Sequence, residues 1–354
     1  MELNLTKSIM LSRNQKVAIY MENHIYSEYG KMGMGVLSYL KNPIVCVIDS
    51  ENFGTDIQDH YPNLKSVPIV ETLKDAVKLN AEVLILGIAP SGGKVPPKWF
   101  PVIENAISNG LCVVNGLHDL LSERYSNLIK NKDQWIWDVR LPKFVPEIAT
   151  GKASKIQNTR LLLVGTDMAC GKMTTALEIY SWANKMKIKT AFIATGQIGI
   201  TITGDGIPLD SFKVDHACGA VEQKVMENSE MDLIIIEGQG SLLHPASTAT
   251  LPLLRGSCPT HLILCHRAEK EYLRFPENIK IPNLKKFIKL NESLSHVCGA
   301  YPKAKCIGVS LNTSKLNEKN AKKVIHKIHK STGLNVTDPI RFGVDKICLD
   351  LIKT

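Results

Sequence analysis

The segment Leu161-Leu-Leu-Val164 runs directly into Gly165-Thr-Asp-Met-Ala-Cys-Gly171-Lys172-Met-Thr-Thr175. The apolar run predicts a buried strand, and the amphipathic stretch after Lys172 predicts a helix. Glycines at both ends of the connecting loop let the backbone turn so tightly that successive N–H groups point inward. The helix adds the positive end of its dipole, and Lys172 adds a full charge. The segment therefore predicts a loop that binds the phosphates of a ligand.

This loop departs from the common pattern G-x-x-x-x-G-K-[ST] in two respects. Gly165 stands six residues before Gly171 instead of five, and Met173 occupies the place of the usual hydroxyl residue. Thr174 and Thr175 must then supply the hydroxyl. The longer loop is similar to that of dethiobiotin synthetase and its relatives. The predicted phosphate-binding residues are Gly165, Thr166, Asp167, Ala169, Cys170, Gly171, Lys172, Met173, Thr174 and Thr175.

A second element supports the first, because the apolar run 231–236 ends at Glu237 and is followed by Gly-Gln-Gly-Ser. An acid at the tip of a parallel strand beside a phosphate loop commonly holds Mg²⁺. We therefore predict Glu237 and Thr174 as ligands of a possible Mg²⁺, with helix capping as the alternative role of the carboxylate. Lys172, Glu237 and His244 are the candidate catalytic residues. His244 is a candidate base because histidine is the side-chain type that titrates nearest neutrality, although a structural histidine fits the sequence equally well.

A glycine-rich excursion follows another predicted strand, from Thr195-Gly-Gln197 to the segment 204–216. Open α/β sheets bind substrates beyond the carboxyl ends of their strands. Polar side chains of this excursion, and others close behind Glu237, are therefore candidates for substrate contact, although turn residues would look much the same. The candidates are Gln197, Asp205, Asp215, Gln239 and Arg255.

Apolar runs and amphipathic stretches alternate along the whole chain, which favours right-handed crossovers and parallel sheets. The first series has candidate strands at 16–20, 44–49, 67–70, 83–88 and 111–115, with helices at 72–79 and 99–108. The second has strands at 160–165, 190–194, 232–237, 261–265 and 305–309, with helices at 172–187, 219–228, 283–296 and 317–331. Residues 141–158 separate the two. We predict an α/β protein of two domains, a Rossmann-like parallel sheet in 1–145 and a P-loop NTPase-like (dethiobiotin-synthetase-like) parallel sheet in 146–354.

Glycines also cluster in the first domain, at positions 30, 33 and 35. Their spacing of three and then two residues is the reverse of the dinucleotide-binding pattern G-x-G-x-x-G. Asp49 follows the last of them by only 14 residues, less than the spacing of about 20 that the pattern expects. A dinucleotide site in this domain is therefore disfavoured.

The composition of the chain excludes several classes of protein. Its 354 residues include 43 Lys and Arg against 34 Asp and Glu, and 44% are apolar, which is too apolar a mixture for disorder. No run of roughly 20 apolar residues predicts a membrane span, and residues 1–14 lack the pattern of a secretory signal. Nine cysteines without a C-x-x-C pair are typical of a reducing compartment. We expect a cytoplasmic protein that does not associate with membranes.

Positive charge is concentrated in one region, since residues 267–346 contain 17 Lys and Arg against 7 Asp and Glu. Solvated lysine faces on helices are the simplest explanation. A field that attracts an anionic small molecule is the alternative. Few aromatic residues accompany this charge, and no nucleic-acid-binding motif is present, so we expect no nucleic acid partner.

Taken together, these motifs resemble the DgcN-like family, long known only as a domain of unknown function, and the resemblance covers nearly the whole chain. In the first domain the similar stretches are Tyr29-Gly-Lys31, Val47-Ile-Asp49, Gly87-Ile-Ala-Pro-Ser-Gly-Gly93 and Asp138-Val-Arg140. In the second they are Gly165-Thr-Asp, Gly171–Glu178, Thr195-Gly-Gln197, Gly204-Asp-Gly206, Ile236–Pro245, Leu264-Cys-His266 and Val336–Gly343.

The resemblance implies a Rossmann-like N-terminal domain, a P-loop C-terminal domain, and transfer of an acetyl group from acetyl-CoA to the amine of D-glutamate or a similar D-amino acid. Acetyl-CoA would then be the phosphorylated ligand, and a small amino acid the substrate. His216 stands where an apolar or aromatic residue is expected, which leaves the acceptor open. We also expect a homo-oligomer. Two alternatives remain, an ATP- and Mg²⁺-dependent kinase or ligase acting on a small carboxylic acid, and a non-catalytic nucleotide-binding module.

Overall fold

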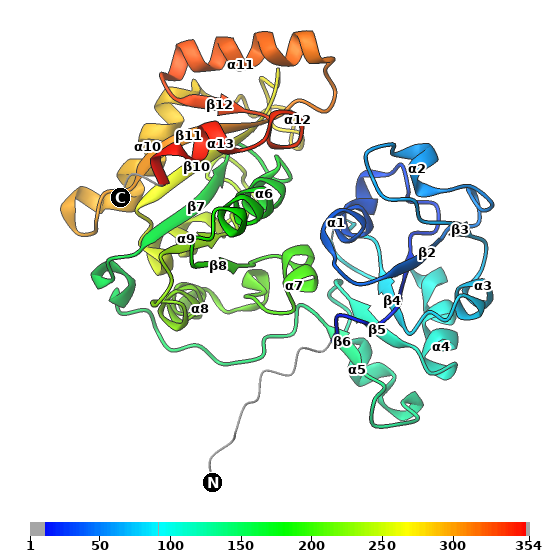
Figure 1. The fold of residues 1–354 in the computed structure, drawn as a ribbon. Coiled ribbons are helices and arrows are strands. Elements are labelled where there is room, and N and C mark those ends of the chain that lie inside the picture. Colours follow the sequence, from blue (N-terminus) through cyan, green and yellow to red (C-terminus); the bar gives the residue numbers. More distant parts are fainter. Residues whose placement is uncertain (1–10, 91, 352–354) are drawn as a thin grey trace. The chain divides into compact units, whose positions relative to one another are not determined.

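A computed structural model describes residues 11–90 and 92–351 of the chain. Its internal contacts divide the chain into two compact units (Figure 1). The first unit comprises residues up to Lys143 together with Gln197–Ser211, and the second comprises Phe144–Gly196 and Phe212–Thr354. Each unit contains a sheet of parallel strands, which confirms the predicted fold class. The sequence did not predict that residues 197–211 make their contacts with the first unit. The domain boundary at residue 145 stays a prediction.

The first unit has a six-stranded parallel sheet in the order β3-β2-β1-β4-β5-β6, with the reversal of strand order between β1 and β4. Its strands are β1 (Val17–Tyr20), β2 (Ile44–Ile48), β3 (Ile69–Val70), β4 (Val83–Leu86), β5 (Cys112–Asn115) and β6 (Ile136–Asp138). Its helices are α1 (Lys31–Tyr39), α2 (Ile57–His60), α3 (Leu73–Lys78), α4 (Phe100–Ser108), α5 (Leu121–Arg124) and α7 (Gln197–Thr203). This order is that of dinucleotide-binding Rossmann folds.

The glycines of α1 have a packing role in this unit. The N–H group of Gly33 donates a 2.8 Å hydrogen bond to the Gly87 carbonyl at the end of β4. A Cβ atom on Gly33 would lie 2.3 Å from the sulfur of Met21, which is closer than Cβ atoms come to other atoms in proteins. Glycine therefore lets α1 approach the ends of β1 and β4 closely. The absence of a dinucleotide site in this unit stays a prediction.

The second unit also has a six-stranded parallel sheet, in the order β12-β11-β10-β7-β9-β8 (Figure 1). Its strands are β7 (Thr159–Gly165), β8 (Thr190–Ile193), β9 (Leu233–Ile236), β10 (His261–Arg267), β11 (Lys305–Asn312) and β12 (Asn335–Thr337). Its helices are α6 (Lys172–Lys185), α8 (Val214–Glu227), α9 (Thr250–Ser257), α10 (Leu284–His296), α11 (Glu318–Thr332), α12 (Pro339–Phe342) and α13 (Asp345–Cys348). Because β7 lies between β9 and β10, the predicted phosphate loop emerges from the middle of the sheet.

Both sheets are covered on their two faces, as parallel sheets require. Strands β4, β5 and β9 are buried along their whole length. In the second unit the core joins β7, β9 and β10 to α6 through Leu161, Leu163, Ile235, Ile263 and Ile179. Among the described residues, no helix is both long and apolar enough to cross a bilayer.

A buried arginine connects the beginning of β7 to the end of α9. The Arg160 guanidinium donates to the carbonyls of Ser257 (3.0 Å), Cys258 (2.9 Å), Ile156 (2.9 Å) and Asn158 (2.9 Å). Burial lowers the pKa of this group below its ordinary value, because the charged form has lost water. Four carbonyl acceptors compensate for that loss.

We expect Arg160→Met to destabilise the second unit by about 3 kcal/mol, because the substitution leaves several buried carbonyls without donors. Urea unfolding followed by circular dichroism measures the effect. Arg124→Met is a matched control, since that exposed guanidinium lies over the Phe100 ring at 4.3 Å and contributes about 1 kcal/mol or less. Equal loss of stability in the two variants would contradict the proposed role of Arg160.

Candidate phosphate-binding site

The phosphate loop has the local geometry that its sequence predicts. Strand β7 ends at Gly165 and α6 begins at Lys172, with Gly171 at φ 105° between loop and helix. The first helical hydrogen bond is the 2.9 Å bond from the Thr175 N–H to the Gly171 carbonyl. The N–H groups of the preceding residues in the first turn therefore have no partner within the helix. They are available to an anionic ligand.

Lys172 is the most informative residue of the loop, because it is a buried cation that is only 6% exposed. Its ammonium group donates to the Asp167 carbonyl at 2.8 Å and lies 3.7 Å from the Cys170 sulfur. Within the described part of the chain, no carboxylate forms an ion pair with it. A buried charge that meets only neutral acceptors is costly unless a ligand of opposite charge completes the site. The loop therefore fits a phosphorylated ligand.

The two predicted hydroxyl residues have different environments. Thr175 is buried, and its hydroxyl donates to the Gly171 carbonyl at 2.8 Å and lies 2.7 Å from the Ser310 hydroxyl. Thr174 is half-buried, and its hydroxyl has no hydrogen-bond partner among the described residues. Thr175 therefore holds the loop to the sheet, and Thr174 is the hydroxyl that remains for a ligand.

Residues at and beyond the end of β10 support the loop from its other side. Thr166 shares a 2.9 Å hydrogen bond between its hydroxyl and Nδ1 of His266, and both side chains are buried. The Arg267 guanidinium donates to the Ala169 carbonyl at 2.7 and 3.2 Å. Burial lowers the pKa of His266 to about 4, so its ring is neutral at physiological pH, although Asp167 acts in the opposite direction.

Sequence reasoning did not assign roles to His266 and Arg267. Both follow an apolar run, His261–Cys265, which was itself predicted as a strand. Neighbouring parallel strands end at the same edge of a sheet, and β10 pairs directly with β7. That adjacency is the signal that would have placed them beside the loop, but it depends on strand order, which spacing alone does not reveal.

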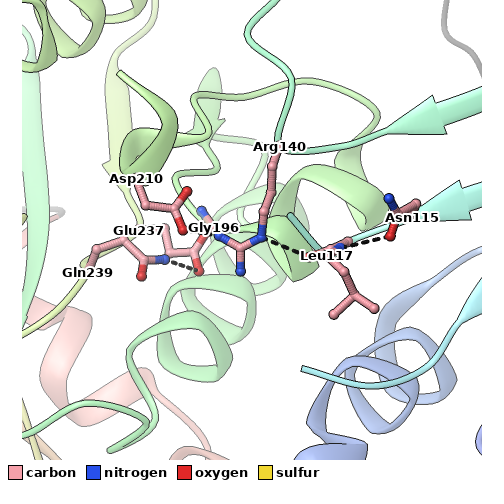
Figure 2. A network of polar contacts seen from close by, with 8 residues as sticks. Asn115, Leu117, Arg140, Gly196, Asp210, Glu237 and Gln239 are labelled. Carbon is pink, nitrogen blue, oxygen red and sulfur yellow. Dashed lines mark hydrogen bonds and ion pairs between the residues drawn. The ribbon is translucent and has the colours of Figure 1, made fainter. Parts of the chain in front are cut away.

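Glu237 follows the last residue of β9 and is almost completely buried. Its Oε2 accepts hydrogen bonds from the N–H groups of Thr195 (2.9 Å) and Gly196 (3.3 Å), and its Oε1 accepts one from the Gln239 amide at 3.4 Å (Figure 2). Burial raises the pKa of Glu237 to about 7, and the two backbone N–H groups and the Lys172 ammonium reduce that rise. The carboxyl group is therefore able to accept and return a proton near neutral pH.

His244 is less well placed to act as a base. Its ring is buried, and Nδ1 accepts a 3.2 Å hydrogen bond from the Ala246 N–H. A neutral imidazole with an occupied Nδ1 lone pair carries its proton on Nε2. Neither nitrogen then has a free lone pair, so the geometry favours Glu237 over His244 as the proton acceptor.

Among the predicted substrate residues of the second unit, Gln239 contacts Glu237 directly. Asp215 is exposed in the first turn of α8. Arg255 donates to the Leu294 carbonyl at 2.7 Å and lies over the Tyr301 ring, so its side chain already has partners on α10 and in the loop that follows. Gln197 begins α7 and Asp205 is exposed just beyond it, both in the first unit, and their substrate roles stay predictions.

The possible Mg²⁺ site stays a prediction. Oε2 of Glu237 accepts two backbone N–H bonds, whereas Oε1 accepts only the 3.4 Å bond from the Gln239 amide and keeps a free lone pair. That lone pair can serve a proton or a cation. No group of three or more His, Cys, Asp or Glu residues in the described ranges has the arrangement of a metal site.

Comparison with known proteins covers both units. Residues 147–348 match the family described as a domain of unknown function, DUF1611_C, P-loop domain, and residues 50–142 match DUF1611_N, Rossmann-like domain. The chain is 36% identical to a D-glutamate N-acetyltransferase of Pseudoalteromonas over 280 residues, which cover 78% of this chain and 83% of the relative. It is 35% identical to a D-glutamate N-acetyltransferase of Tritonibacter scottomollicae over 279 residues, with the same two coverages. The crystal structure of a DUF1611 family protein from Anabaena variabilis has a TM-score of 0.92 and 41% identity, covering 96% of this chain and 99% of that chain.

The raised pKa of Glu237 makes stability depend on pH in a defined direction. The folded state holds the proton more tightly than the unfolded chain, where an ordinary glutamate has a pKa near 4.5. The stability contributed by this group is therefore fully present below about pH 4.5 and is lost as the pH rises through 7. We expect wild type to lose up to about 3 kcal/mol relative to Glu237→Gln between pH 4.5 and pH 8.

Urea unfolding of both proteins at a series of pH values measures this difference, and the exposed Glu230→Gln is the control. A difference between wild type and Glu237→Gln that stays constant over this pH range would show that Glu237 is not a buried, proton-binding carboxyl group.

Proposed function

This chain belongs to the DUF1611 family, and on that premise we propose that it is an N-acetyltransferase, which transfers the acetyl group of acetyl-CoA to the amine of D-glutamate or a similar D-amino acid. The relatives named D-glutamate N-acetyltransferase align with more than three quarters of the chain. One structural observation carries the proposal. A buried carboxyl group held by two backbone N–H donors, Glu237, lies within electrostatic reach of the buried lysine of a phosphate loop. This pairing suits proton transfer at a ligand that the loop anchors by its phosphates.

Acetyl-CoA supplies the phosphates that such a loop requires. Its pyrophosphate would accept hydrogen bonds from the first-turn N–H groups of α6, from the Thr174 hydroxyl and from the Lys172 ammonium. In the structure Lys172 donates to the Asp167 carbonyl, so the incoming phosphate would replace that neutral acceptor with an anionic one. Anchoring by the phosphates fixes the thioester end of the molecule, and such positioning supplies a large part of the rate enhancement in group transfer.

The reaction itself needs one proton acceptor and one oxyanion stabiliser. The neutral amine of the substrate attacks the thioester carbonyl carbon, a C–N bond forms, and the carbonyl oxygen becomes an oxyanion. Glu237 takes the proton that the nitrogen loses. The C–S bond then breaks, and the protonated Glu237 returns the proton to the departing sulfur. A carboxyl group whose pKa lies near 7 serves in both directions at neutral pH.

Gln239 is the neighbouring polar group that would orient the substrate. Its amide nitrogen lies 3.4 Å from Glu237 Oε1, and the hydroxyl of Thr250 donates to its backbone carbonyl at 3.1 Å (Figure 2). A Cβ atom on Gly196 would lie 2.2 Å from that amide nitrogen, so glycine at this position leaves room for the amide. The Gln239 amide is therefore held beside the proton acceptor, where it can donate to a substrate oxygen.

An ATP-dependent kinase or ligase would use the same loop with Mg²⁺ held by Glu237. In that use the free lone pair of Glu237 Oε1 would hold the metal instead of a proton. The two functions are separated by their ligands, because one requires acetyl-CoA and the other requires ATP with Mg²⁺.

We expect acetyl-CoA at about 100 times its Kd to raise the melting temperature by roughly 5–10 °C, because a ligand that binds only the folded state stabilises it by mass action. The rise should disappear in Lys172→Ala, which removes the cation of the loop. Lys185→Ala is the matched control, since it removes an exposed cation from the other end of the same helix and should leave the rise intact. Stabilisation by ATP with Mg²⁺ and none by acetyl-CoA would contradict the proposal.

We also expect Glu237→Gln to lower kcat for acetyl transfer by about 10²–10⁴-fold with little change in KM for acetyl-CoA, because a glutamine cannot accept a proton. In wild type the rate should increase as the pH rises through about 7, since only the ionised carboxylate is a base. Steady-state kinetics between pH 5 and pH 9 test both points. A full rate in Glu237→Gln, or the same rise near pH 7 in the variant, would exclude Glu237 as the base.

A further inference from the structure

Two of the groups that hold Glu237 stand at the point where the chain leaves the second unit. Thr195 and Gly196, whose N–H groups donate to Glu237 Oε2, are the last residues before Gln197, and residues 197–211 belong to the first unit. The Gly196–Gln197 peptide bond therefore links the two N–H donors of Glu237 to a segment whose contacts lie in the first unit. This segment (197–211, the strap) therefore bears directly on the Gly196 N–H group, whereas Thr195 is also held within the second unit, where its hydroxyl donates to the Glu237 carbonyl at 2.8 Å.

Arg140 contacts the end of the strap directly and its beginning only through Gly116. Its Nε donates to the Gly116 carbonyl at 2.8 Å, and its Nη1 forms an ion pair with Asp210 near the end of the strap (Figure 2). At the beginning of the strap, the side chain of Gln197 packs on Gly116, with its Cγ 3.3 Å from the place a Cβ would take. The Arg140 side chain is only 13% exposed, so this ion pair is partly shielded from solvent on the arginine side.

The support that Arg140 uses is itself rigid. The Asn115 amide donates to Asp138 at 2.8 Å and to the Asp119 carbonyl at 2.6 Å. Its oxygen accepts from the Leu117 N–H at 3.0 Å (Figure 2). These bonds fix the turn 115–119 that carries the Gly116 carbonyl. Arg140, two residues beyond Asp138, thus joins a braced turn to the strap.

We propose that Arg140 is a positioning residue for Glu237, because it fixes the strap and thereby the placement of the Thr195 and Gly196 N–H groups that hold the carboxylate. The role of Glu237 as the base rests on the proposed function, but its placement by Arg140 does not. A planar guanidinium suits this task because its rigid fork reaches a carbonyl and a carboxylate at once, which the single ammonium of lysine cannot do.

The consequence for Glu237 has a definite sign. The groups that face its carboxyl are the N–H groups of Thr195 and Gly196, the Gln239 amide and the Lys172 ammonium. Each favours the ionised form. Loosening the two backbone donors removes part of that stabilisation while burial remains, so the carboxyl should hold its proton to higher pH.

The test compares Arg140→Met with Arg140→Lys and Asp210→Asn. The control is Lys78→Met, which removes an exposed ion pair to Asp75 in the first unit, well away from the strap in sequence. Two quantities are measured on the full chain. The first is amide hydrogen exchange at Thr195 and Gly196, and the second is the pH of half-maximal acetyl transfer. In Arg140→Met we expect exchange to increase at least about tenfold and the half-maximal pH to rise by about one unit. Arg140→Lys should recover little of either, and Lys78→Met should match wild type.

Asp210→Asn keeps the hydrogen bond from Arg140 to Gly116 and should give smaller changes in the same directions. This variant therefore tests the role of Arg140 if Arg140→Met does not fold. Unchanged exchange at Thr195 and Gly196 in folded Arg140→Met or Asp210→Asn would overturn the proposal. Increased exchange without any acetyl transfer in wild type would support the positioning role and refute the proposed function instead, because exchange is measured without substrate.

Discussion

The buried ammonium of Lys172 is the constraint on which the rest of the site depends. A cation held at the end of β7 by a carbonyl and a sulfur is stable only in surroundings that compensate for lost water. Those surroundings are the end of β10, which braces the loop through His266 and Arg267, and the end of β9, which brings a carboxyl group within electrostatic reach. Three neighbouring strands thus converge on one charge. The phosphate-binding and proton-transfer roles proposed for this edge of the sheet both follow from that convergence.

Electrostatics in this region act in two opposing directions. Burial makes the ionised form of Glu237 unfavourable, whereas Lys172 and the backbone donors of Thr195 and Gly196 make it favourable. Burial is the larger influence and raises the pKa to about 7, and the donors and Lys172 limit that rise. A carboxylate exposed to water would be a weak base, and one buried without donors would remain protonated. The loop and the two N–H groups are therefore as important for chemistry as the carboxyl group itself.

The sequence was sufficient to predict the glycine-bounded loop, the end of β7 at Gly165, the start of α6 at Lys172 and the acid after β9, because each is a local pattern of apolar residues, glycines and charge. It was also sufficient for the fold class, which follows from the alternation of elements. It did not predict the short strands β6 and β12, whose three residues each give no periodicity. His266 and Arg267 were missed because their role depends on strand order. Arg255 was chosen as a polar residue close to Glu237 in sequence, but α9 carries it to α10 instead.

Residues 197–211 lie within the sequence of the second unit and yet are counted by their contacts with the first. The polypeptide consequently passes from one unit to the other at three places, after Lys143, after Gly196 and after Ser211. Proteins built from consecutive domains exchange those domains freely during evolution, since a single linker joins each domain to the next. Here neither half is a complete module, so recombination at any one junction would leave one partner without part of its fold. This interleaving offers a physical reason for the two halves to be inherited together.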